Sequence, residues 1–343
     1  MRTLATTIFC LATPAFADVP NVVTDIAPVR SIVSQIMAGA GDPAQIIPAG
    51  ASPHGYSMRP SEAQALSKAD LIVWVGPGLT GWLEAPLVNL APDAEQMILM
   101  DVPGVVQLGF REGALFAPHA HGHHEGESED AGHDDHAEHE DHAQHDDHED
   151  HADDEGHEDH DDLADHDGHE DHADHATDPH VWLDPRNVQV WAEAIARHLA
   201  TLDPERADLY RSNAAALIAQ LESLEEEIDS MLAPVRAQPY LVLHDGYHYF
   251  EARFDIEARG SVFLGDGRSP GPARLQALRE AIAASPVVCA FAEPQMDTAL
   301  LTTATEGSAV RIATLDPLGT DDTSYADLMR GIADSLLACL SEE

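Results

Sequence analysis

The stretch Asp70-Leu71-Ile72-Val73-Trp74-Val75-Gly76 is almost entirely apolar between an acidic residue and a glycine. A short apolar run of this kind is typical of a strand that is buried on both faces of a parallel sheet. Expected helices flank it, one that opens at Ser61 and one from Trp82 to Leu90. Strands that alternate with helices predict a parallel sheet covered by helices, so this region indicates an α/β fold.

The same alternation extends in both directions along the chain. In the N-terminal part, we expect further strands at 21–25, 44–47 and 96–101 and a helix at 28–37. In the C-terminal part, strands are expected at 240–244, 261–264, 287–291 and 310–315, and helices at 273–284, 298–305 and 324–340. The chain therefore predicts two α/β halves with parallel-rich sheets.

A long uninterrupted helix is expected between the halves. Asp203-Pro204 is a cap followed by proline at the first helical position, and Glu205 to Leu232 contains no Gly or Pro. At 1.5 Å per residue this makes a rod of about 42 Å, which would tie two (β/α) lobes together. The expected divisions are a signal peptide at 1–17, an N-terminal lobe at 18–118, an insertion at 119–177, the end of the N-terminal lobe at 178–202, the linking helix at 203–236 and a C-terminal lobe at 237–343.

The insertion is a tract of Asp, Glu and His. It has seventeen histidines between His119 and His175, thirteen of them on a register of three, and its only large apolar residue is Leu163. Such a segment cannot bury enough surface to order itself, but its imidazoles and carboxylates suit divalent transition metals, so we expect a disordered metal binder rather than a solvated linker or a pH-sensitive tail. The expected auxiliary ligands include His119, His121, His123, His124, His133, His136, His139, His142, His145 and His148.

Composition and the first residues indicate an exported protein. The net charge is −45, and 36 of the 62 acidic residues lie outside positions 119–178, which argues against binding to nucleic acid or anionic membrane. Arg2, a short apolar run and Ala15-Phe16-Ala17 match a secretory signal peptide cleaved before Asp18, and a first helix of the fold is the alternative. No later stretch has the roughly 18 apolar residues of a membrane span. In an exported chain, the two cysteines that remain, Cys289 and Cys339, favour a disulfide.

Four residues outside the tract are candidate metal ligands. His54 follows a strand in a loop, His180 lies where the tract rejoins the fold, and His244 and Asp316 stand at strand ends, where ligands collect in α/β sheets. Three imidazoles and a carboxylate suit tetrahedral Zn²⁺. A single His at a strand end is more often structural than a ligand, however, so spacing alone leaves the site open. His198 is expected to be structural, and His248 ranks below His244 because it lies beyond the strand end.

Five motifs resemble the metal-binding periplasmic proteins of zinc ABC importers, the ZnuA family. They are Ala51-Ser52-Pro53-His54-Gly55-Tyr56-Ser57-Met58-Arg59-Pro60-Ser61, Asp178-Pro179-His180-Val181-Trp182-Leu183-Asp184-Pro185, His244-Asp245-Gly246-Tyr247-His248-Tyr249-Phe250, Phe291-Ala292-Glu293-Pro294-Gln295 and Thr314-Leu315-Asp316-Pro317-Leu318-Gly319. The resemblance covers nearly all of the chain after the signal peptide.

The resemblance implies two lobes joined by a long helix, with zinc held between them on His54, His180 and His244 and with Asp316 as the fourth ligand. Manganese-binding relatives have a carboxylate where His244 stands, so the imidazole favours zinc. The resemblance also implies a His-rich insertion before the second ligand and a disulfide between Cys289 and Cys339. Pro53 departs from relatives that have Glu before the first ligand, and this leaves Asp316 or water as the fourth partner.

The implied function is a periplasmic carrier that is not an enzyme. It would capture Zn²⁺ as a monomer and deliver it to an inner-membrane ABC permease with a cytoplasmic ATPase, while the tract binds zinc more weakly. Uptake should weaken below about pH 6.5, because the ligand imidazoles must be deprotonated. Three alternatives remain: a zinc hydrolase with an open coordination position, a zinc buffer that acts through the tract, and a manganese or iron carrier.

Overall fold

The computed structural model describes residues 18–111, 115–116, 177–263, 270–284 and 287–341. The expected signal peptide, nearly all of the tract and position 264 lie outside these ranges. Within them, no helix is both long and apolar enough to cross a membrane. The two lobes expected from the sequence are confirmed, each built on its own parallel sheet.

The first sheet has the order β2-β1-β3-β4, with all neighbouring strands parallel. Its strands are β1 (Val22–Thr24), β2 (Ala44–Gln45), β3 (Leu71–Trp74) and β4 (Glu95–Ile98). All four residues of β3 are buried, as its apolar sequence predicts for a strand covered on both faces. The expected strand at 96–101 ends early because residues 99–101 form the 3₁₀ turn η3 (Leu99–Asp101).

The second sheet repeats this topology in the order β6-β5-β7-β8, again all parallel. Its strands are β5 (Tyr240–His244), β6 (Gly260–Phe263), β7 (Cys289–Ala292) and β8 (Arg311–Thr314). The pairing aligns Val242 of β5 with Phe291 of β7. The order of the strands reverses between β5 and β7, and in parallel sheets the carboxyl ends of the strands at such a point form the usual ligand-binding crevice.

Helices cover the sheets and connect the two lobes. They are α1 (Ala27–Ile36), α2 (Pro60–Leu66), α3 (Pro77–Thr80), α4 (Glu84–Leu90), α5 (Pro185–Leu202), α6 (Ala207–Leu232), α7 (His248–Phe254), α8 (Pro272–Ala284), α9 (Ala299–Thr305) and α10 (Tyr325–Ser341). The long helix begins two residues later than expected because Pro204–Arg206 form a 3₁₀ turn. Asp203 stabilises this junction by accepting hydrogen bonds from Arg206 and Tyr210.

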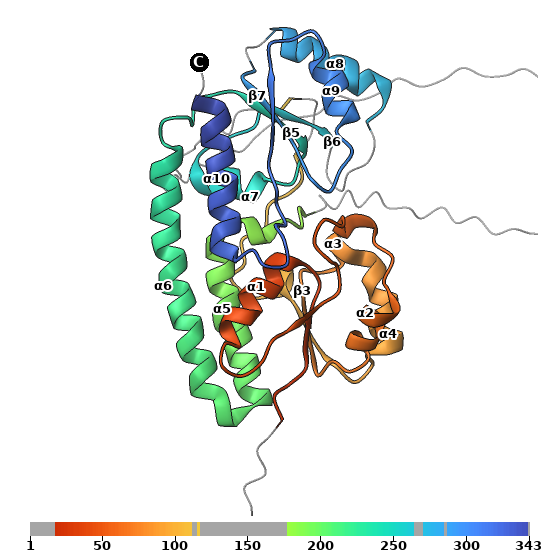
Figure 1. Ribbon diagram of the computed structural model, residues 1–343, viewed down its shortest axis with the longest axis vertical. Helices are drawn as coiled ribbons and strands as arrows, with labels where there is room; N and C mark the ends of the chain where they lie inside the picture. Colours follow the sequence, from red (N-terminus) through yellow and green to blue (C-terminus); the bar gives the residue numbers. More distant parts are fainter. Residues whose placement is uncertain (1–17, 112–114, 117–176, 264–269, 285–286, 342–343) are drawn as a thin grey trace, which may run out of the picture. The chain divides into compact units, whose positions relative to one another are not determined.

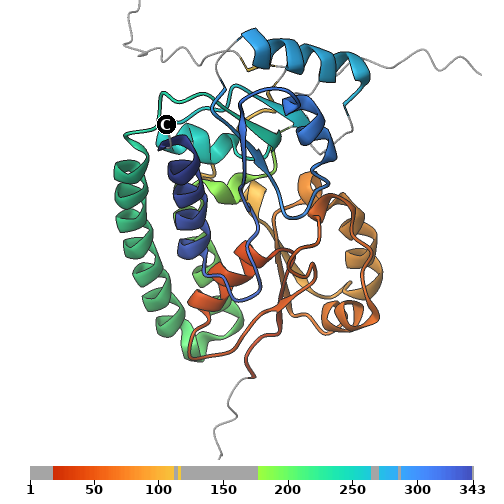
Figure 2. The same ribbon diagram turned by 45° about the horizontal axis from the view of Figure 1, so that its top comes forward.

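The long helix α6 packs against elements of both lobes. It contacts α1 and α5 from the N-terminal part of the chain and α10 from the C-terminal part (Figures 1 and 2). Its buried face consists of residues spaced three or four apart: Tyr210, Ala214, Leu217, Leu221, Leu224, Ile228 and Leu232. This spacing forms one apolar stripe, which explains how a single helix serves both lobes.

Helix α7 was not expected from the sequence. Residues His248 to Phe254 were left without an element, yet they form a helix whose side chains are mostly buried. The helix ends at Asp255, which adopts a left-handed conformation with φ of 51°. Because the helix starts four residues after the end of β5, it brings Tyr249 and Glu251 next to the chain that leads into and out of the tract.

The segments that lead into and out of the tract are hydrogen-bonded to each other. Gly109 and Thr177 form an isolated antiparallel bridge, and the Asp178 amide donates to the Leu108 carbonyl at 2.9 Å. The hydroxyl of Tyr249 on α7 accepts from the Leu108 amide and donates to the Asp178 carbonyl, each at 2.8 Å. Consequently the chain re-enters the fold at a fixed position just before His180.

A disulfide joins Cys289 of β7 to Cys339 of α10, as expected. Both cysteines are buried, and they are separated by 50 positions in the chain. The link therefore ties the closing helix α10 to the second sheet.

Removing this disulfide should destabilise the fold. For the double variant Cys289→Ala/Cys339→Ala, we expect the free energy of unfolding to fall by about 2–4 kcal/mol, because the unfolded chain regains the entropy of the open loop. Urea denaturation of the oxidised proteins measures the difference. Full reduction of the wild type should bring its stability close to that of the variant, and equal stability before reduction would contradict the expectation.

Candidate metal centre

His54 lies on a short 3₁₀ turn, η1 (Pro53–Gly55), that follows β2. Pro53 starts this turn, and its carbonyl accepts a hydrogen bond from the Trp82 indole at 2.9 Å. Tyr56 packs edge-on against Trp82, with ring centroids 5.8 Å apart. The region was expected to be a loop, and these contacts explain how such a loop holds its imidazole in place.

His180 immediately precedes a second 3₁₀ turn, η4 (Val181–Leu183), and is buried. Its Nδ1 lies 2.7 Å from Oδ1 of Asp178, and its backbone amide donates to the same oxygen at 2.9 Å. A carboxylate can only accept, so in the neutral ring Nδ1 carries the proton and Nε2 keeps its lone pair. His180 is thus oriented with Nε2 available to an ion.

His244 is the last residue of β5 and is also buried. Gly246 permits this placement, because a Cβ atom there would lie 2.6 Å from Cε1 of His244 and 3.1 Å from Nε2 of His180. Any larger residue at 246 would push the two imidazoles apart. The glycine is therefore required by the close approach of the two rings.

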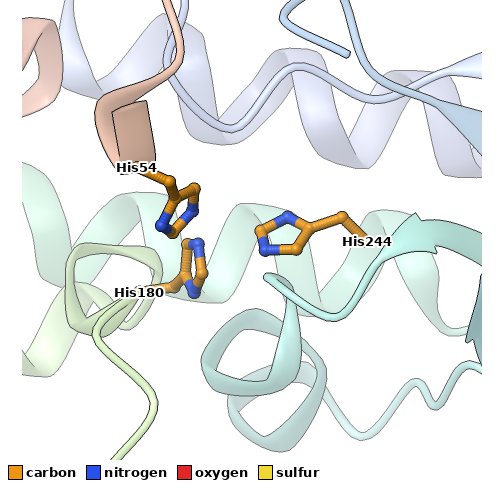
Figure 3. Close-up of side chains that lie close together, drawn as sticks. All are labelled: His54, His180 and His244. Carbon is orange, nitrogen blue, oxygen red and sulfur yellow. The ribbon is translucent and has the colours of Figure 1, made fainter. Parts of the chain in front are cut away.

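The three imidazoles converge from distant parts of the chain, as Figure 3 shows. The ring centroids are 5.5 Å apart for His54 and His180, 5.4 Å for His54 and His244, and 4.7 Å for His180 and His244. One potential ligand atom from each lies within 4.8 Å of the other two. Around one tetrahedral zinc ion such atoms would be about 3.4 Å apart, so a small inward shift would complete the set.

The protonation of the two buried rings is set by their surroundings. Burial lowers the pKa of His180 well below its usual value, and the nearby His244 lowers it further. Burial acts to lower the pKa of His244, but the carboxylates of Glu293, Asp178 and Asp245 together outweigh it and raise that pKa above the usual value. Burial raises the pKa of Asp178 to about 6. His180 is therefore neutral near pH 7, as a metal ligand must be.

Asp316 lies outside the histidine cluster. Its Oδ1 accepts hydrogen bonds from the Gln295 side chain at 2.7 Å and from the amides of Leu318 and Gly319 at 3.1 and 3.0 Å. It follows β8, which is separated from β5 by β7, and each step between neighbouring strands is about 4.8 Å. In this structure Asp316 stabilises the turn that follows its strand, and its service as the fourth ligand remains a prediction.

Glu293 was not expected from the sequence to belong to the site, although it lies in the motif Phe291-Ala292-Glu293-Pro294-Gln295. Glu293 directly follows β7 and is 5% exposed, and its Oε1 lies 3.4 Å from Nδ1 of His244. It lines the small cavity beside the cluster together with His54, His180 and His244. A carboxylate after a buried strand was the available signal, but the position of that strand beside β5 could not be read from the sequence.

The remaining candidates lie elsewhere. His198, on α5, contacts Glu95 with 2.9 Å between Nε2 and Oε2, in keeping with a structural role. His248 is the first residue of α7 and is not part of the three-histidine cluster. The ten tract histidines expected as auxiliary ligands lie outside the described residues.

Comparison with known proteins adds a family match. A family model described as "Zinc-uptake complex component A periplasmic" matches residues 22–339. The chain is 44% identical over 345 residues to the high-affinity zinc uptake system protein ZnuA of Paracoccus denitrificans, with 99% of this chain and 98% of that protein covered. It is 38% identical over 326 residues to the protein of the same name from Brucella suis, covering 94% and 92%.

Solved structures share the fold. A crystal structure of ZnuA superposes with a TM-score of 0.71 at 21% identity and covers 94% of this chain and all of that one. The solute-binding protein FpvC from Pseudomonas aeruginosa in complex with Mn²⁺ superposes with a TM-score of 0.68 at 19% identity, covering 94% and 99%. At these identities the likeness concerns the two-lobed architecture.

Proposed function

Because the chain belongs to the ZnuA family of periplasmic zinc-uptake components, we propose that it captures Zn²⁺ on His54, His180 and His244 and delivers it to an ABC importer. The family fixes the class of protein: a solute-binding component of a zinc ABC transporter, and not an enzyme. Such a component works in the periplasm with a membrane permease and its ATPase.

The main support for the proposed function is the convergence of the three imidazoles. They come from the turn after β2, from the chain that re-enters the fold after the tract, and from the end of β5. Imidazole suits zinc, whereas sites for manganese use mainly oxygen ligands. Since His54 comes from one lobe and His244 from the other, affinity would depend on the lobes being in register, and a small shift between them would release the ion.

The fourth ligand would be Asp316 or a water molecule. Oδ1 of Asp316 already accepts three hydrogen bonds, so Oδ2 is the oxygen through which Asp316 would bind the ion. A water molecule in the fourth position is the alternative. Three protein ligands and one exchangeable position would let zinc leave readily when the lobes separate. The carrier would act as a monomer, with the lobes and the linking helix divided at the boundaries expected from the sequence.

The tract would serve as an auxiliary binder with lower affinity. The chain leaves the tract at Thr177, three residues before His180, so the tether between the tract and the proposed site is short. A zinc buffer would instead depend on the tract for nearly all of its binding. The two functions therefore differ in what remains when the tract is removed.

Deleting residues 119–175 separates these two functions. We expect the deleted protein to retain one tight zinc site while the additional weaker sites disappear, because the three ligands outside the tract are untouched. Calorimetric titration of both proteins with zinc, in the presence of a competing chelator, gives the stoichiometry and affinity. Loss of the tight site on deletion would refute the carrier. The deleted protein should also unfold with the wild-type cooperativity, which serves as the control for folding.

A further inference from the structure

Two buried carboxylates lie beside the two buried imidazoles of the site. Asp178 contacts Nδ1 of His180 at 2.7 Å, and Glu293 approaches Nδ1 of His244 at 3.4 Å. We propose that Glu293 is a positioning residue for His244: its carboxylate accepts the Nδ1–H proton and directs Nε2 toward the ion. The inference rests on the proposed zinc site and adds to it a residue that does not touch the metal.

The topology of the second sheet places Glu293 beside His244. Strands β5 and β7 are parallel neighbours, and Val242 is aligned with Phe291. Two residues further along each strand, the same register brings His244 opposite Glu293 at the carboxyl ends. This contact is therefore built by the backbone pairing of two central strands, and it is not a chance meeting of surface side chains.

Besides His244, the carboxylate of Glu293 interacts with the hydroxyl of Tyr247, whose pKa is raised by burial and further by this carboxylate. The Glu293 side chain is 4% exposed, and its Oε1 is a buried atom without a hydrogen-bond partner among the described residues. Nδ1 of His244 is likewise buried without one. Leaving a buried donor and acceptor unpaired is costly, so a modest rotation that shortens their 3.4 Å separation would satisfy both.

This contact has a direct consequence for metal binding. A neutral imidazole has one N–H, and a carboxylate on Nδ1 favours the tautomer in which Nε2 carries the lone pair. A carboxylate behind a ligating histidine also fixes the plane of the ring and makes it a stronger donor. With Asp178 behind His180 and Glu293 behind His244, both buried ligands would be oriented before the ion arrives.

The test compares Glu293→Leu and Glu293→Gln with wild type and with Glu306→Gln, a control that changes an exposed glutamate of the same lobe. Zinc affinity is measured by competition with a fluorescent chelator. We expect Glu293→Leu to bind about 10- to 100-fold more weakly. Glu293→Gln should lose less, because the amide oxygen still accepts from Nδ1–H. Glu306→Gln should match the wild type.

Nitrogen NMR of the zinc-free wild type reports which ring nitrogen of His244 carries the proton. A purely structural role of Glu293 would not affect this position. With ¹⁵N-labelled histidine, the His244 proton is expected on Nδ1, and in Glu293→Leu it should be shared between the two nitrogens. A wild-type proton on Nε2 would overturn the inference even if the leucine variant does not fold. A folded Glu293→Leu variant that binds zinc with wild-type affinity would also overturn the inference. A Glu293→Gln variant as weak as His244→Ala would also overturn it, since Glu293 would then be a direct ligand.

These outcomes are distinct from failure of the proposed function. If wild-type protein shows no tight zinc site, the proposed function fails and the role of Glu293 falls with it. If the wild type binds zinc tightly and Glu293→Leu binds equally well, only the positioning role is lost.

Discussion

Substituting His180 with alanine is expected to abolish the stabilisation of the protein by zinc. At free zinc about 1,000 times the dissociation constant, the wild type should gain about 4 kcal/mol of stability, because the ion binds the folded chain and not the unfolded one. His180 lies against both other imidazoles, with ring centroids 5.5 Å from His54 and 4.7 Å from His244. Without it, two imidazoles from opposite lobes remain, and they make a poor zinc site.

Thermal unfolding with and without zinc measures this effect. The melting temperature of the wild type should rise markedly with zinc, while that of His180→Ala should change little in a protein from which residues 119–175 have also been removed. His198→Ala in the same background is the matched control, because it removes an imidazole of α5 that contacts Glu95 of β4 and lies outside the three-histidine cluster. A zinc-dependent rise in His180→Ala as large as in the control would show that the ion binds elsewhere.

Replacing Arg111 with methionine should cost about 3–5 kcal/mol of stability, since it leaves two buried carboxylates without their cation. Arg111 is 9% exposed, and its guanidinium is hydrogen-bonded to both Asp245 and Glu251. These two carboxylates outweigh the effect of burial and raise the pKa of Arg111. The guanidinium carbon also lies 3.8 Å from the centroid of the Phe116 ring.

The position of Arg111 means that the loss of stability should affect more than its immediate surroundings. Arg111 lies in the segment that leads into the tract, and Asp245 follows His244. The ion pair therefore joins that segment to the second lobe beside the proposed zinc ligand His244. Urea denaturation of zinc-free protein measures the stability, with Arg197→Met, at an exposed position of α5, as the control. A loss for Arg111→Met no larger than for the control would mean that water replaces the cation at little cost.

Much of the fold was predictable because its signals are local. The strand at 240–244 was expected with the bounds that β5 has, since five residues at these positions are buried on both faces of a parallel sheet. The helix at 207–232 was expected within the run 205–232, because that run contains no Gly or Pro. Helix α7 was missed because its sequence, His248 to Phe254, is rich in aromatic residues that have only moderate helix propensity.

The candidate site was less accessible to local reasoning. His54, His180 and His244 could be proposed as a group through the family resemblance, whereas their spacing in the chain left other histidines, such as His248, in contention. Asp316 was grouped with them because it also follows a strand. Nothing in the sequence around Asp316 shows that β7 lies between its strand and β5.

By itself, the sequence determined the alternation of buried strands and helices, the acidic and histidine-rich character of the chain, and the residue types able to hold zinc. These are properties of short segments, which periodicity and composition express directly. Only the tertiary structure decided that Glu293 faces His244 and that Asp316 caps its own turn. Both outcomes depend on the strand order β6-β5-β7-β8. This order is set by hydrogen bonds between strands far apart in the chain, so it cannot be read from the sequence of any single strand.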